Sequence, residues 1–119
     1  MAIESLEGTR WALEYLTLDD VSHLVNGRRV PEVAFLGGRV SVDDGINRAN
    51  GPYRLSGERF SVTLQSTTRA GYPDERLPEH EVFGYLDLAR TAVVHGDYLH
   101  IGFDGGELVY RWMEDEEPA

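Results

Sequence analysis

The chain contains no cysteine and no lysine, and the first of these absences excludes several kinds of site. Without cysteine there is no disulfide, no thiolate metal site and no cysteine nucleophile, which fits a reducing compartment. Every one of the 11 basic residues is therefore an arginine, and 21 acidic residues bring the formal net charge to −10. Such a chain is not expected to bind nucleic acid or an anionic membrane, because both require a positive field.

The sequence also lacks a long apolar run. Its first residues, MAIESLEGTRW, have neither the basic start nor the apolar stretch of a signal peptide, and no later segment has the length of a membrane-spanning helix. We therefore expect a cytoplasmic protein. A chain of 119 residues, 41% of them hydrophobic, predicts one domain over residues 1–113 and an acidic, disordered tail over residues 114–119.

What is present is a succession of short alternating segments separated by turn residues. Apolar and polar residues alternate, as in strands, over 11–15, 39–43, 60–64, 98–103 and 107–112, and residues 91–95 are a further predicted strand. Asn26-Gly27 predicts a further hairpin turn. The single predicted helix covers about residues 78–90, where proline opens the segment and Val82, Phe83 and Leu86 form an apolar stripe.

These segments predict a mostly β (α+β) fold. Short connections make neighbouring strands antiparallel, so the chain is expected to form a meander. With about seven to eight strands, the predicted shape is a strongly curved sheet or a partly closed barrel, covered by the helix.

Three motifs carry a resemblance to a known family. They are Gly-Thr-x-Trp at residues 8–11, Gly-x-Asn-x-x-x-Gly-x-Tyr at 45–53 and Thr-Thr-x-x-x-x-Pro at 67–73, followed by an acid-containing helix and a closing hairpin. Over roughly residues 6–112 the chain resembles the META domain family, which includes the HslJ-like heat-shock proteins. The resemblance implies a small β-rich domain with one helix, and it implies no catalytic residue, because the family has no established shared ones.

The resemblance also assigns structural roles. It marks Gly45 and Gly51 as architectural residues. Ile46 and Tyr72 stand at two positions where the family pattern has cysteine. If those cysteines lie close together in relatives, these two side chains should touch here, and their presence removes any redox role.

The polar segment DDGINRANG, which begins at Asp43, allows three interpretations. A calcium loop fails, because the twelfth position needs a bidentate glutamate and Arg54 occupies it. A structured bend would use the two glycines for unusual φ angles, and the second aspartate and the asparagines for hydrogen bonds to nearby backbone. A binding surface would use Asn47 and Arg48.

Two other groups of side chains are candidates. Thr68 and Arg69 could bind an anion, although threonine hydroxyls at a strand end more commonly satisfy backbone groups. His95 and His100 flank a predicted turn and could approach each other, but they lack a third zinc ligand. We predict neither a metal nor a cofactor.

The sequence thus favours a non-enzymatic small binding or interaction domain, whose ligand, a protein or a small molecule, it does not specify. One alternative is a lipocalin-like carrier that holds a small apolar ligand inside a closed barrel. Another is a small hydrolase or isomerase that uses carboxylates at a barrel mouth. No catalytic residue is assigned, and the binding candidates are Asn47, Arg48, Thr68 and Arg69.

Overall fold

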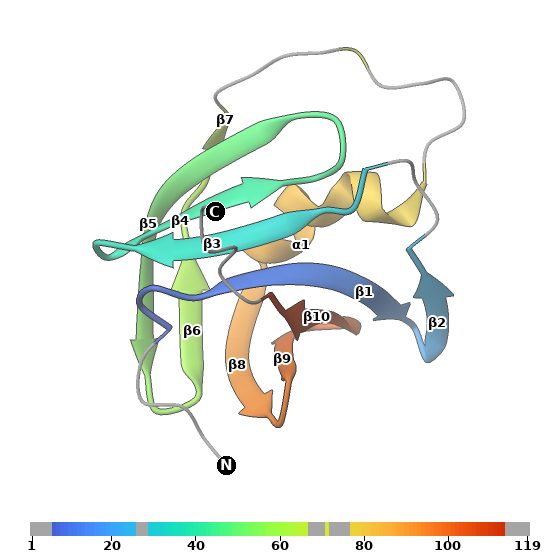
Figure 1. Cartoon of the computed structure of the whole chain (residues 1–119). Coiled ribbons are helices and arrows are strands. Elements are labelled where there is room, and N and C mark those ends of the chain that lie inside the picture. The colour runs from blue at the N-terminus through green and yellow to red at the C-terminus, as the bar shows by residue number, and fades with distance from the viewer. Residues whose placement is uncertain (1–5, 26–28, 67–70, 72–76, 114–119) are drawn as a thin grey trace.

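A computed structural model describes residues 6–25, 29–66, 71 and 77–113, which form an antiparallel β-barrel with one short helix (Figure 1). The strands are β1 (Arg10–Leu18), β2 (Val21–Leu24), β3 (Glu32–Leu36), β4 (Arg39–Asp43), β5 (Arg48–Ser56), β6 (Arg59–Val62), β7 (Gln65–Ser66), β8 (Ala89–His95), β9 (Tyr98–Phe103) and β10 (Gly106–Trp112). The helical segment comprises η1 (Pro78–Glu81) and α1 (Val82–Asp87).

Eight of the described strands close into a ring. Their order is β10-β9-β8-β6-β5-β4-β3-β1, and β1 pairs again with β10, so that Trp11 lies opposite Trp112. β2 and β7 lie outside this ring and pair with β1 and β5. The narrowest pairing is between β6 and β8, where Arg59 lies opposite Thr91. The predicted curved or partly closed sheet is therefore a closed barrel with one weak seam.

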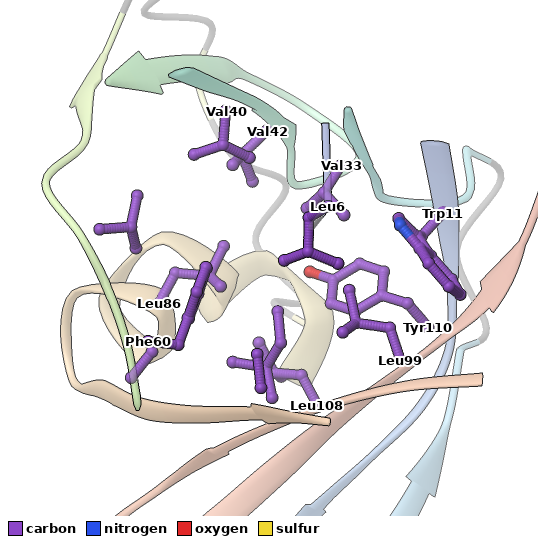
Figure 2. Packing of buried hydrophobic residues seen from close by; sticks show 14 of the residues in the cluster. Leu6, Trp11, Val33, Val40, Val42, Phe60, Leu86, Leu99, Leu108 and Tyr110 are labelled. Carbon is purple, nitrogen blue, oxygen red and sulfur yellow. The ribbon is translucent and has the colours of Figure 1, made fainter. Parts of the chain in front are cut away.

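Alternation along the strands fills the barrel interior with apolar side chains (Figure 2). Leu99 and Ile101 of β9 and Leu108 and Tyr110 of β10 have no exposed surface, as the alternation predicts. The buried Tyr110 hydroxyl has no hydrogen-bond partner among the described residues, and burial raises the pKa of this tyrosine. The described core is thus packed side chain against side chain.

The helix is shorter than the sequence predicts. It was expected over residues 78–90 but ends at Asp87, and Ala89 already belongs to β8. The residues after the helix pair with β9, and this long-range pairing overrides the local helical pattern. The predicted apolar stripe is confirmed at Val82 and Leu86, which are buried.

The first hairpin turn was not predicted. Asp19 and Asp20 connect β1 to β2 with φ angles of 49° and 67°, the left-handed values that a two-residue type I′ turn requires. The predicted turn at Asn26-Gly27 falls on residues 26–28, outside the described part. Leu24 of β2 and Glu32 of β3 both pair with β1, so the strands on either side of that dipeptide do not pair with each other as predicted.

The Gly-Thr-x-Trp motif fastens the N-terminal segment to the barrel. Gly8 has a φ of +78°, and its N–H donates to a carbonyl of β3. The Thr9 hydroxyl donates to the Leu6 carbonyl and accepts a 2.8 Å hydrogen bond from the Trp11 indole. The motif thereby places Leu6, which is fully buried, in the core beside Tyr110 (Figure 2).

A carboxylate holds the same segment against the next hairpin. Glu7 accepts hydrogen bonds from the backbone N–H groups of Gly37 and Gly38, at 2.6 and 2.7 Å, and from the Tyr53 hydroxyl at 2.7 Å. The hydrogen bond from Tyr53, followed by that from Gly38, lowers the pKa of Glu7. Burial, with the adjacent carboxylate, raises the pKa of Tyr53.

This contact predicts an acid-sensitive contribution to stability. Because the pKa of Glu7 is lowered in the folded state, its stabilisation is complete above the unfolded-state pKa and is lost as the pH falls through the folded-state pKa. Glu7→Gln should therefore melt at a lower temperature than the wild type at neutral pH, and the difference should shrink as the pH falls below the ordinary pKa of glutamate. Thermal melts across this pH range test it. Glu58→Gln, at an exposed glutamate, should leave the pH profile unchanged.

Candidate functional site

Within the segment DDGINRANG, residues 44–47 form a tight turn between β4 and β5. Asp44 is fully buried, and its Oδ1 accepts the backbone N–H groups of Ile46 at 2.8 Å and Asn47 at 2.6 Å. The Asp44 N–H donates to the Asn47 carbonyl at 3.1 Å. Asn47 is only 4% exposed and belongs to the turn, where the bend interpretation placed it, so its side chain offers little surface to a ligand.

The two glycines of this segment serve different physical purposes. Gly45 has a φ of +95°, as the bend interpretation required, and a Cβ there would lie 3.2 Å from the Arg29 carbonyl oxygen. Gly51 lies within β5, and a Cβ there would overlap the Thr63 carbonyl oxygen. Gly51 is therefore required for close backbone approach and not, as predicted, for its φ angle.

The remaining candidates of the sequence divide into two groups. Ile46 is half-buried. Tyr72, Thr68 and Arg69 lie outside the described residues, so the contact between Ile46 and Tyr72 and the anion-binding role stay predictions. Asn50 lies in β5 and not in the bend.

Arg48 remains a surface residue, and it lines a groove on the outer face of β1, β3, β4 and β5. These four strands lie side by side in the barrel wall (Figure 1). The groove has a volume of about 460 Å³. It is lined by Arg10, Arg29, Val30, Glu32, Val33, Ala34, Ser41, Asp43 and Arg48, and we call it the arginine groove.

Strand register explains why this surface is hollowed. Arg10, Ala34 and Ser41 stand in one row across β1, β3 and β4. Glu32, Asp43 and Arg48 stand in the neighbouring row. Directly opposed residues of antiparallel strands point to the same face, so short side chains at Ala34 and Ser41 leave a depression between longer ones.

Three guanidinium groups meet two carboxylates in the groove. Arg10 Nη2 lies 3.1 Å from Glu32 Oε1, and Asp43 Oδ2 contacts Arg29 and lies 3.9 Å from Arg48 Nε. The arginine side chains remain 44%, 51% and 64% exposed, so a ligand can reach all three. The pair of Arg10 with Glu32 is exposed on both sides, and such pairs contribute about 1 kcal/mol or less, so an incoming anionic group can replace it at small cost.

The turn and the groove form one unit. Asp43 Oδ1 accepts the Gly45 N–H at 2.7 Å, while the other carboxylate oxygen faces the arginines. The sequence indicated Arg48 but missed Arg10, Arg29 and the groove itself. The alternation of inward and outward side chains along each strand could have placed Arg10 and Arg48 on the outer face. Only the register of β3 against β1 and β4, however, shows that they lie close together.

The histidines meet as the sequence suggested. The ring centroids of His95 and His100 lie 5.9 Å apart, edge to face, and His100 Nδ1 lies 3.1 Å from Glu107 Oε1. No group of three or more His, Cys, Asp or Glu side chains among the described residues is arranged to hold a metal ion. No helix in that same part of the chain has the length and apolar character needed to span a membrane.

The barrel, its N-terminal motif and its helix are those of a known sequence family. The sequence profile of the META domain matches residues 4–116. The chain belongs to the META domain family. A search among curated proteins gave no match to this META domain.

Solved structures share the fold of this META domain. One, determined by NMR, is a protein from Burkholderia xenovorans, with a TM-score of 0.68 and 20% identity over 91% of this chain and 83% of that one. A second NMR structure has a TM-score of 0.70 and 19% identity over 93% and 95% of the two chains. A lipocalin-like protein from Bacteroides uniformis has a TM-score of 0.57 and 23% identity over 89% and 96%.

Proposed function

We propose that this META domain is a non-enzymatic, cytoplasmic binding module that takes its ligand on the outer face of the barrel, in the arginine groove. The observation that carries the proposal is the combination of a packed interior with a hollowed, accessible outer surface. The ligand best suited to the groove is polar and bears an acidic group to meet Arg10, Arg29 or Arg48. We do not propose nucleic acid or anionic membranes as ligands, because the chain carries a net charge of −10.

The groove's chemistry supports binding more than catalysis. Guanidinium groups keep their proton at any physiological pH, so they hold anions but do not serve as general acids or bases. Among the described residues, those whose pKa is moved from its ordinary value are Glu7, Tyr53, Tyr85 and Tyr110, and none of them lines the groove. We therefore prefer a binding module to a hydrolase or isomerase.

A carrier would need space inside the barrel. The centre is occupied by Leu6, Phe60, Leu86, Leu99 and Leu108, each at most 3% exposed. The likeness to a lipocalin-like protein extends to the fold and does not supply a cavity. These facts argue against the carrier hypothesis.

A groove-filling variant tests the proposal. Ser41 is exposed on the groove floor, so Ser41→Trp should fill the depression without entering the core. We expect polar metabolites or short acidic peptides that raise the melting temperature of the wild type to lose this effect on Ser41→Trp, because a ligand stabilises the state it binds.

Ser22→Trp is the matched control, since Ser22 is an exposed serine of β2, outside the groove. This variant should respond to ligands as the wild type does. Hits that stabilise Ser41→Trp and the wild type equally would place the binding site elsewhere and contradict the proposal.

A further inference from the structure

We propose that a second groove, over the seam between β6 and β8, binds a phosphate-type dianion, either free or as the head of a phosphomonoester. This seam groove has a volume of about 410 Å³ and is lined by Arg54, Arg59 and Arg90 together with small and apolar residues. It lies on a different part of the barrel wall from the arginine groove and shares no lining residue with it. The inference therefore goes beyond the binding role proposed above.

The seam explains why a groove exists there. Between β6 and β8 the paired residues are Arg59 and Thr91, supplemented by a 2.9 Å hydrogen bond from the Ala92 N–H to the Glu58 carbonyl. The register of β8 also shifts between Ala89 and Thr91, which marks a bulge. Bulges bend a strand locally and occur next to functional sites. The groove over this seam is bordered by the buried Phe60 and Ala89.

The arginines stand close enough to share one ligand. Arg54 of β5 lies opposite Ser61 of β6, and Arg59 of β6 lies opposite Ser56 of β5. All four side chains are exposed on the outer face, so the two arginines are diagonal neighbours, with a separation of about 7–8 Å. Arg90 adjoins Thr91, the residue paired with Arg59. Long, flexible guanidinium arms from these positions converge on a single small anion.

The charge of the seam groove is not balanced by the described residues. None of its described lining residues is acidic, and within the described part of the chain Arg54 and Arg59 make no ion pair. Arg90 lies 3.1 Å from Asp104, but these side chains are 69% and 78% exposed, and such pairs contribute little. Like charges held this close repel one another, and a bound dianion would remove the repulsion.

The chemistry of the lining fits a phosphate group. A guanidinium donates two parallel hydrogen bonds to phosphate oxygens, and the Ser56 and Ser61 hydroxyls add further donors. Phe60 and Ala89 also border the groove, but their side chains are buried, so the contacts with a ligand come from the arginines and the serines. A nucleic-acid polymer is disfavoured, because its many phosphates would meet a chain with a net charge of −10.

The test is a titration of the full-length protein at constant ionic strength, followed by backbone NMR. The probes are inorganic phosphate and phosphoserine, with sodium chloride as the screening control. We expect both phosphates to shift the amide signals of Ser56, Arg59 and Ser61 saturably. A stronger response to phosphoserine would assign the site to phosphomonoesters. An equal response to the two probes would assign it to the phosphate group alone.

Two charge-matched variants locate the effect. Arg59→Gln should weaken phosphate binding about tenfold, as expected for the loss of a charge-assisted contact. Arg111→Gln removes the same charge from an exposed position of β10 that lines neither groove, and it should change the affinity less than about twofold. Without phosphate, Arg59→Gln should melt no lower than the wild type, because it relieves repulsion. Non-saturable shifts, the same response to chloride, or equal losses in the two variants would overturn the proposal.

Discussion

Gly51→Ala is expected to destabilise the barrel by about 3 kcal/mol or more, because the added methyl group overlaps a backbone carbonyl. Gly51 lies opposite Val40 in the ladder of β4 and β5, and the Thr63 carbonyl approaches its Cα from the chain segment that follows β6. A side chain could yield by changing its rotamer. A backbone carbonyl cannot, so either β5 or the segment that joins β6 to β7 must move.

Chemical denaturation of the purified variant measures the effect as a change in the free energy of unfolding. Gly84→Ala is the matched control. Gly84 lies in α1, where an added Cβ would have no neighbour within 4 Å, so alanine there should stabilise by about 0.5–1 kcal/mol. Equal effects of the two substitutions would contradict the close approach at Gly51.

Trp11→Ala is expected to cost about 3–5 kcal/mol, the range for removing a large buried aromatic side chain. Trp11 is 1% exposed, donates its indole hydrogen bond to Thr9 and packs edge to face on Trp112 at a centroid distance of 5.1 Å. It also lies at the pairing of β1 with β10 that closes the ring. The variant therefore loses core volume, the anchor of the N-terminal motif and an aromatic contact at the closure.

Trp112→Ala serves as the comparison, because Trp112 is 41% exposed and makes the same aromatic contact from the other side. It should cost less than half as much as Trp11→Ala. The chain has two tryptophans, so each variant retains one fluorescent reporter of unfolding. Similar losses in both variants would show that the shared contact, and not burial of Trp11, carries the effect.

Local patterns in the sequence predicted the strands of this META domain well. The closing hairpin, in which Leu99, Ile101 and Leu108 point inward, follows from period-two alternation and a Gly-containing turn. The Asp19–Asp20 turn was not predicted, because two aspartates adopt positive φ less readily than an Asn-Gly pair and therefore give a weaker turn signal.

The candidate site was harder to predict, since it depends on distant pairings. Arg48 was identified from its own segment, whereas Arg10 and Arg29 join it only through the register of β3 against its two neighbours. The same holds for Gly51, whose role depends on the close approach of the Thr63 carbonyl oxygen. Asn47 belonged to both the bend and the binding interpretation, because a buried turn asparagine and an exposed binding asparagine look alike in sequence.

The pairing of β1 with β10 also sets the order of events while the chain is being made. Trp11 and Trp112 are separated by roughly 100 positions, so the ring cannot close until the last strand has left the ribosome. β2 and β3 can cover one edge of β1 early, because both follow it closely in the chain. The other edge stays open throughout synthesis, and a nascent chain that stalls before β10 presents it to any strand nearby. Pairing with β10 is thus the step that protects the open edge of β1.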